Sequence, residues 1–160
     1  MKLAIASIQN ITWFKILAIL LGVFILICIG SAYSASRQVV ASKSTTLNGQ
    51  PIRLLVTTTA TEQYQGLSDR ERICDSCGML FTFDDARERT FVMRRMLFAL
   101  DIVWVHKQRV VRVDTNLAPE STEPYTPYSS RVPVDTVLEL PAGSAQRYGL
   151  TEGTAFDLKN

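Results

Sequence analysis

The sequence has few of the residues and motifs on which most enzymes depend. It contains one histidine, His106, and it lacks a nucleophile elbow, a phosphate-binding loop and a Ser/His/Asp arrangement. General acid-base chemistry would therefore fall to carboxylates. These absences disfavour an enzyme without excluding one. We predict neither a metal site nor a cofactor.

The chain also lacks a basic cluster. Lys and Arg total 17 against 15 Asp and Glu, but Lys2 and Lys15 belong to the amino-terminal segment. From Arg37 onward the two signs are equal, at 15 each. A neutral domain with Arg94-Arg95 as its only adjacent basic pair predicts no nucleic-acid partner.

One long hydrophobic run is present, at the amino terminus. Residues 16–29 carry no charge, and apolar or small residues extend the run to 11–33 with Lys15 as its only charge. About 20 apolar residues suffice to span a bilayer. We therefore predict that residues 1–35 form a membrane anchor, with membrane contact through residues 11–33.

A cleaved export signal is the alternative interpretation of the same run. Ala32-Tyr33-Ser34 before Ala35 resembles a cleavage site, which would release a secreted or periplasmic protein after cleavage near Ser34. Because the whole segment resembles an export signal, we expect the domain on the outer side of a cell membrane crossed once. Both alternatives place the domain outside the cytoplasm.

The rest of the chain predicts a flexible tether over residues 36–50 and one β-rich domain over residues 51–160. The tether is rich in Ser, Thr and Ala and shows no hydrophobic period. In the domain we expect strands at 52–59, 78–83, 90–93, 100–106, 109–115, 134–140 and 155–158. Strand 100–106 is apolar at successive positions, which predicts a central strand with both faces covered.

Turns and two short helices complete the expected fold. Asp84-Asp85 and Lys107-Gln108 are the expected turns between neighbouring strands. One helix should begin at an N-cap Thr61 and end at Gly66, and another should cover 144–148 before Gly149. The predicted class is α+β and mainly β: six to seven short, mostly antiparallel strands in a barrel-like sheet, with two short helices.

Five ordered motifs resemble the family called domain of unknown function 192. They are Gln65-Gly66-Leu67 with Arg70; Gly78-Met79-Leu80-Phe81 with Phe83; Phe91 with Met93; Leu100-Asp101-Ile102; and Val137-Leu138-Glu139-Leu140-Pro141-Ala142-Gly143. The resemblance covers about residues 51–158. It implies a small β-rich domain, often preceded in bacteria by an export signal or lipid anchor, for which no activity is established.

The sequence departs from that family pattern at two places. After Phe91 the family usually has Trp, Met, Lys and Asn, whereas this chain has Val92, Met93, Arg94 and Arg95. Before Asp101 the family usually has Ile-Pro-Leu, and position 99 here is alanine. If the missing Trp and Asn belong to a shared site, these departures alter it.

Cys74 and Cys77 form the sharpest local motif. Outside the cytoplasm, two cysteines at this spacing most simply form a structural disulfide. The alternatives are a redox-active pair, which this spacing favours by lowering a thiol pKa, and a metal site, for which too few other ligands are present. His106 is expected to be an exposed turn residue.

The candidate binding residues are Arg70, Arg94, Asp101, Glu139, Tyr125 and Tyr128. If Asp101 is buried, it needs a partner, either as a structural ion pair with an arginine or as part of a binding site. Glu139 either faces solvent or lines a polar depression with Asp101 and an arginine. Tyr125 and Tyr128 lie in the proline-rich loop 116–133, where they either stack on a ligand or fix the loop to the sheet.

These observations favour a membrane-tethered or exported binding or accessory module. Its expected partner is an envelope protein, a peptide or a glycan. The alternative is an extracytoplasmic enzyme or a thiol-disulfide redox protein that uses Cys74 and Cys77.

Overall fold

The structure is a computed structural model that describes Trp13, residues 15–25 and residues 40–159. The chain divides into two compact units, Met1–Val39 and Val40–Asn160. In the first unit, residues 15–25 are helical. None of the helices among the described residues has both the length and the hydropathy needed to cross a membrane. The rest of the predicted anchor, the cleavage position near Ser34 and residues 36–39 of the predicted tether lie outside the described residues.

The second unit is built on a seven-stranded sheet and a separate two-stranded ribbon. The sheet order is β6-β5-β8-β3-β2-β1-β9, and the ribbon is β4-β7. The elements are β1 (Ala41–Leu47), β2 (Gln50–Val56), α2 (Ala60–Gln65), β3 (Cys77–Arg87), β4 (Thr90–Phe91), β5 (Leu100–His106), β6 (Arg109–Leu117), β7 (Tyr128–Ser129), β8 (Val134–Pro141), α3 (Ser144–Arg147) and β9 (Leu158–Lys159). All pairings are antiparallel except the parallel pair β2-β3. The prediction of a mainly β, mostly antiparallel domain is confirmed.

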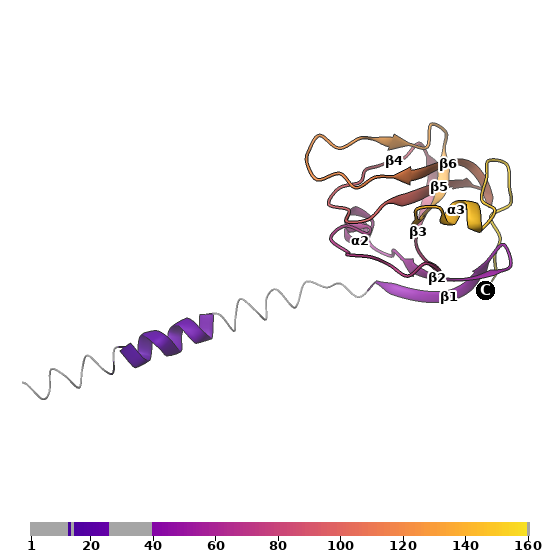
Figure 1. Ribbon diagram of the computed structural model, residues 1–160. Helices are drawn as coiled ribbons and strands as arrows, with labels where there is room; N and C mark the ends of the chain where they lie inside the picture. The colour runs from indigo at the N-terminus through magenta and orange to yellow at the C-terminus, as the bar shows by residue number, and fades with distance from the viewer. Residues whose placement is uncertain (1–12, 14, 26–39, 160) are drawn as a thin grey trace, which may run out of the picture. The chain divides into compact units, whose positions relative to one another are not determined.

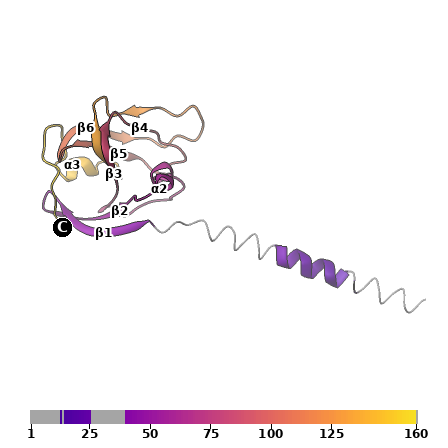
Figure 2. The same ribbon diagram turned by 180° about the vertical axis from the view of Figure 1, so that it is seen from behind.

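The sheet curves but does not close. In Figures 1 and 2, β1 and β2 lie on one side of α3, and β5 and β6 lie on the other. The strands at the two edges are β6 and β9, and β9 has two residues. One isolated bridge, between Arg109 and Ala155, joins β6 to the chain before β9. The prediction of a barrel-like sheet is therefore wrong, because no ladder links the two edge strands in the part of the chain that the structure describes.

The predicted tether contains a strand. β1 pairs with β2 over seven residues, from Ala41 opposite Val56 to Leu47 opposite Gln50. The connecting residues Asn48 and Gly49 both have positive φ, 49° and 80°, as a two-residue type I′ hairpin requires. The tether prediction was wrong for residues 41–47 because β1 exposes most of its side chains, so its sequence shows no apolar alternation.

The predicted acidic turn is also wrong. Asp84 and Asp85 lie inside β3, which continues to Arg87 with an irregular register against β8 beyond Thr82. The predicted strand 90–93 is reduced to β4, which pairs with β7 and not with β3. The polar end of β3 is exposed, so charged residues are tolerated in a strand there.

Both faces of the central strands are buried. On one face, alternate residues of β3, β5 and β8 join a cluster of Leu67, Met79, Phe81, Met93, Met96, Leu100, Ile102, Trp104, Val134 and Val137. On the other face, Leu80, Val103, Leu138 and Leu140 pack with α3 and the β1-β2 hairpin. The prediction that strand 100–106 is covered on both faces is confirmed, and the hairpin β5-β6 around Lys107-Gln108 is confirmed with it.

Candidate functional site

Glu139 lies at the centre of the sheet. It belongs to β8, where Met79 of β3 and Ile102 of β5 are its register partners on either side. Since side chains alternate along a strand, Glu139 projects from the face opposite Leu138 and Leu140, which is the face of the cluster that contains Met79. The side chain is therefore surrounded by apolar neighbours.

The Glu139 carboxyl group is buried, and one of its oxygens lacks a hydrogen-bond partner in the part of the chain that the structure describes. The residue is 5% exposed, and its Oε2 atom contacts no donor among the described residues. Burial raises the pKa of this carboxyl group from 4.5 to about 8. The interpretation in which Glu139 faces solvent is therefore wrong, and burial favours the protonated carboxyl group at neutral pH.

A cleft of about 260 Å³ opens above this carboxyl group. One wall comes from the end of α2 and the residues after it. Gly66 ends this helix with φ of 52°, and a Cβ atom on Gly66 would lie 3.7 Å from Glu139 Oε2. Glycine is favoured here by the positive φ, and a Cβ atom would make only an ordinary van der Waals contact with the acid.

The helix that supplies this wall is held by a capping box. Thr59 is the N-cap: its hydroxyl accepts from the Glu62 amide, and the Glu62 carboxylate accepts from the Thr59 amide. The predicted N-cap, Thr61, instead lies within the helix. The predicted helix end at Gly66 is confirmed.

The second wall comes from Thr90, Phe91, Val92, Arg94 and Met96, among which Arg94 is the charged residue. The Arg94 guanidinium lies 3.8 Å from the centroid of the Tyr64 ring and donates a hydrogen bond to the Tyr64 carbonyl. Its Nε atom is buried and has no hydrogen-bond partner among the described residues. The Arg94 guanidinium thus packs against the end of α2 and contributes a positive charge to the lining of the cleft.

Two further contacts hold the walls together. The Ser68 hydroxyl donates to the Arg94 carbonyl at 2.8 Å, and Arg95 Nη2 lies 2.8 Å from Asp69 Oδ2. The hydrogen bond from Arg95 lowers the pKa of Asp69. Arg95 therefore joins the two walls.

Asp101 has a structural role and does not line the cleft. It is fully buried, and its two carboxylate oxygens accept backbone N–H groups of Asn116 and Ala145, both at 2.9 Å. The expected pairing of Asp101 with an arginine is wrong, because amides of the irregular end of β6 and of α3 satisfy the charge. The predicted depression shared by Asp101 and Glu139 is not formed: Glu139 and Arg94 share the cleft, and Asp101 is absent from it.

The other predicted binding residues lie around the cleft or outside it. Arg70 is half-buried and is not among the residues that line the cleft. Tyr128 is half-buried in β7, opposite Phe91 of β4, and packs against the core. Tyr125 is half-buried near Arg95, whose raised pKa comes mainly from Asp69 and in smaller part from Tyr125.

Aromatic contacts tie the β4-β7 ribbon to the sheet. Phe91 meets Phe81 edge to face with ring centroids 5.0 Å apart, and it meets Trp104 in the same way at 5.5 Å. Because Phe91 also lines the cleft, the ribbon carries one wall and is fixed by the core. Of the two alternatives for the loop tyrosines, Tyr128 therefore agrees with the one in which the side chain fixes the loop to the sheet.

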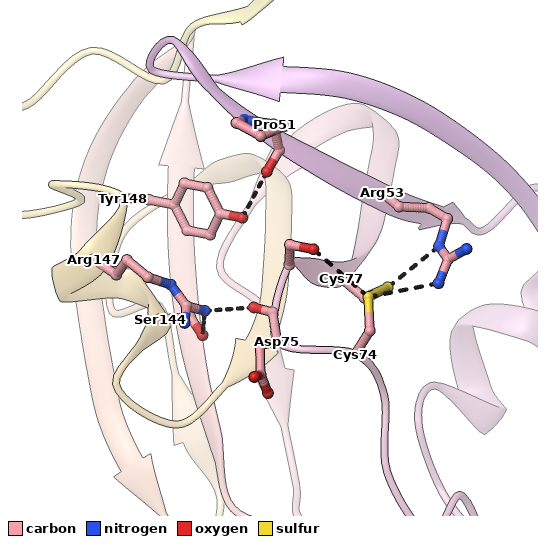
Figure 3. Close-up of a disulfide and its surroundings, with 9 residues drawn as sticks. Pro51, Arg53, Cys74, Asp75, Cys77, Ser144, Arg147 and Tyr148 are labelled. Atoms are coloured by element: carbon pink, nitrogen blue, oxygen red, sulfur yellow. Dashed lines mark hydrogen bonds between the residues drawn. A yellow bond between two sulfur atoms is a disulfide. The ribbon is translucent and has the colours of Figure 1, made fainter.

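Cys74 and Cys77 form a disulfide, with the exposed Cys74 in the loop and the buried Cys77 at the start of β3. Figure 3 shows the Arg53 guanidinium beside both sulfur atoms, with Nε 3.4 Å from Cys77 Sγ and Nη2 3.6 Å from Cys74 Sγ. Arg147 donates to the carbonyl of Asp75 in the same loop. Among the described residues, no group of three or more histidine, cysteine or acidic side chains could hold a metal ion.

A second hollow, of about 400 Å³, lies near the β5-β6 turn. Lys107 and Asp135 are among its polar lining residues, and Leu80 and Phe156 are among its apolar ones. His106 is half-buried beside it, with Nδ1 3.2 Å from Asp135 Oδ2, so the expectation of an exposed turn residue is wrong in its burial. We favour the Glu139 cleft as the candidate site, because it has an unpartnered acid at its floor.

The sequence left two parts of these sites unidentified. The burial of Glu139 could not be predicted from the sequence. A strand that is covered on both faces has no polar-apolar alternation to indicate which of its residues lies at a cavity. Arg53 was overlooked because its closeness to the cysteines depends on the parallel pairing of β2 with β3, where it lies opposite Cys77. The Gln65-Gly66-Leu67 motif was the available signal for the cleft wall.

Comparisons with known proteins agree on the fold and assign no activity. A crystal structure of a candidate transcription regulator from Sinorhizobium meliloti is 25% identical, has a TM-score of 0.68, and covers 77% of this chain and 98% of its own. A protein of unknown function from Novosphingobium aromaticivorans is 28% identical, with a TM-score of 0.67 over 76% of this chain and 89% of its own. No curated protein matches. The model of a family named DUF192 and described as "Uncharacterized ACR" matches residues 42–158.

Proposed function

The chain belongs to the DUF192 family, and from this premise we propose that its domain is a binding module that takes up a small polar group in the cleft above Glu139. The observation that carries the proposal is the buried, unpartnered Oε2 atom at the floor of an open cleft. A buried polar atom without a partner costs about 1 to 3 kcal/mol. A ligand that supplied the missing hydrogen bond would recover part of that cost.

The cleft chemistry suits a small group with both polar and apolar parts. Protonated Glu139 can donate one hydrogen bond and accept others, and Arg94 adds a positive charge to the lining. Tyr64 and Phe91 add aromatic area to the lining. A volume of about 260 Å³ is slightly below the usual range for drug-sized ligands, so one side chain of a peptide or one sugar unit fits it best.

Binding is favoured over catalysis by the composition of the cleft. Acid-base catalysis commonly needs two titratable groups with separated pKa values. Among the described residues that line the cleft, Glu139 is the single carboxyl group. We therefore retain an extracytoplasmic enzyme only as the second candidate function.

The proposed setting is the cell envelope. The hydrophobic run over residues 11–33 supports a membrane anchor or an export signal, so the partner would be an envelope protein, a peptide or a glycan. The description of the Sinorhizobium protein as a regulator of transcription is not carried over to this chain. Equal numbers of acidic and basic residues from Arg37 onward argue against a nucleic-acid partner.

Site-specific photocrosslinking in native membranes tests the proposal. A photoreactive residue at Val92, which lines the cleft and is 37% exposed, should give a discrete crosslinked product. Glu139→Gln should retain the product, because glutamine preserves the shape and the hydrogen-bonding capacity. Glu139→Leu should lose it and yet unfold at a higher temperature, because leucine removes the unsatisfied polar atom.

The same photoreactive residue at Glu152, which is exposed and lies outside both the cleft and the proline-rich loop, provides the control and should give no such product. An unchanged product in the Glu139→Leu protein would rule out the proposed site.

The proline-rich loop is tested separately. Arg94 forms an isolated bridge with Glu120, which places the start of this loop beside the cleft wall. Tyr125→Ala combined with Tyr128→Phe removes the tyrosine contacts and keeps the aromatic packing of β7. If the loop belongs to the binding surface, the Val92 product decreases several-fold. An equal yield would remove the loop from the proposal.

A further inference from the structure

The Cys74–Cys77 disulfide is asymmetric in its exposure. Cys74 is exposed, whereas Cys77 is 6% exposed and begins β3. A thiol in solution can therefore reach Cys74 Sγ far more easily than Cys77 Sγ. Thiol-disulfide exchange requires attack on one sulfur and departure of the other, so this exposure fixes the direction of the reaction.

Arg53 supplies a positive charge to both sulfur atoms. Its guanidinium donates to Cys77 Sγ at 3.4 Å and to Cys74 Sγ at 3.6 Å (Figure 3). The position is set by the backbone, because Arg53 lies opposite Cys77 in the parallel ladder and its amide donates to the Ser76 carbonyl at 2.9 Å. A neighbouring arginine stabilises a thiolate relative to a thiol.

The other charged groups near the loop leave this effect in place. Arg147 donates to the Asp75 carbonyl and to the Ser144 hydroxyl, which adds a second positive charge beside the loop. The Asp75 carboxylate is exposed and points away from the sulfur atoms in Figure 3. The immediate surroundings of the disulfide are therefore electropositive.

We infer that Cys74 and Cys77 form a thiol-disulfide exchange site for an external dithiol, with Arg53 as the residue that stabilises the leaving thiolate. This inference is independent of the Glu139 cleft. It rests on the exposed Cys74, the buried Cys77 and the guanidinium that contacts both sulfur atoms.

The exchange proceeds in two steps that balance. A thiolate of the dithiol attacks Cys74 Sγ; a mixed disulfide forms, the Cys74–Cys77 bond breaks, and Cys77 leaves as a thiolate beside Arg53. The second thiolate of the dithiol then attacks its own sulfur in the mixed disulfide and releases Cys74. Two electrons pass to the cysteine pair, the dithiol becomes a disulfide, and its two protons pass to solvent or to the new thiolates.

Equilibration with glutathione buffers, followed by alkylation and mass analysis, tests the role of Arg53. The full chain with Cys28→Ser is used, so that only the pair reacts. We expect the pair to be half-reduced within the accessible range of buffers. Arg53→Gln should lower the equilibrium constant for reduction of the pair about tenfold, which corresponds to a decrease of about 30 mV in its two-electron reduction potential. Arg53→Lys should restore most of the lost equilibrium constant.

Arg72→Gln is the matched control, because Arg72 is an exposed arginine of the same loop and should leave the equilibrium unchanged. A pair that stays oxidised in reduced glutathione alone, or an equal constant in the Arg53→Gln and unaltered proteins, would overturn the inference.

Single-cysteine proteins test the direction of attack even if Arg53→Gln fails to fold. With Cys28→Ser present, Cys77→Ser leaves the exposed Cys74, and Cys74→Ser leaves the buried Cys77. We expect Cys74 to react with an aromatic disulfide reagent at least tenfold faster and to form a stable mixed disulfide with the probe. Rates within twofold of each other would contradict the assigned direction.

Discussion

Two carboxyl groups on adjacent strands differ in how the fold satisfies them. Asp101 of β5 accepts hydrogen bonds from two backbone amides, whereas Glu139 of β8 has an oxygen without a partner among the described residues. Both residues were predicted from the sequence as candidate binding residues, but the sequence could not show which of them has a structural role. The amides come from Asn116 and Ala145, which only the tertiary fold brings to Asp101.

The raised pKa of Glu139 predicts a pH-dependent stability. Its pKa is about 8 in the folded protein and near 4.5 when unfolded, so the folded state binds the proton more tightly. The resulting stabilisation is fully present below about pH 4.5, declines as the pH rises and is lost above about pH 8. The largest possible change is about 5 kcal/mol.

Urea unfolding between pH 5 and pH 9 measures this effect. Glu139→Gln should remove the decline between pH 5 and pH 8, because glutamine does not titrate. Glu71→Gln, at an exposed position, should leave the decline unchanged. Parallel pH profiles for the unaltered and Glu139→Gln proteins would contradict the assigned pKa.

Among the secondary-structure elements, the sequence predicted well those with a clear apolar period. Strands β5 and β8, the Lys107-Gln108 turn and helix α3 followed by Gly149 all agree with the expectation. The failures lie at strands whose side chains are mostly polar. β1 and the second half of β3 expose their side chains, so backbone pairing stabilises them without an apolar pattern.

The asparagine-glycine pair at residues 48 and 49 was the signal for the first hairpin. This dipeptide strongly favours a two-residue turn, and its left-handed φ values confirm that it forms one. The polar segment before such a turn is therefore better interpreted as a strand than as a tether.

The hairpin predicts where the folded domain begins. A chain beginning at Val40 should unfold cooperatively, because it retains the whole second compact unit. A chain beginning at Pro51 lacks β1 and the fully buried Leu47. Removal of one buried leucine side chain costs about 2 to 5 kcal/mol, and the lost ladder adds to that cost.

Circular dichroism during heating compares these two chains. We expect a cooperative transition for the chain from Val40, and a much lower or absent transition for the chain from Pro51. Equal melting temperatures would show that β1 is dispensable.

For the whole molecule, we expect the hydrophobic run to determine location. Its apolar length predicts retention in the membrane fraction after alkaline washing, with the domain digested by protease added from outside the cell. A chain beginning at Val40 is the control and should remain in the soluble fraction. Mass analysis distinguishes the alternatives, because a mature protein beginning at Ala35 would support the cleaved signal and contradict the anchor.

The order of strands in the sheet has a consequence for biosynthesis. β8, which emerges late, lies between the earlier strands β3 and β5, and β9 pairs with β1, the first strand of the second compact unit. Until residues 134–141 are available, β3 and β5 have no common neighbour. The β1-β2-β3 and β5-β6 pairings use earlier residues, but only β8 joins these two parts into one sheet, through contacts between distant segments that form slowly. The domain acquires both its cleft and its full sheet only after nearly the whole chain has emerged.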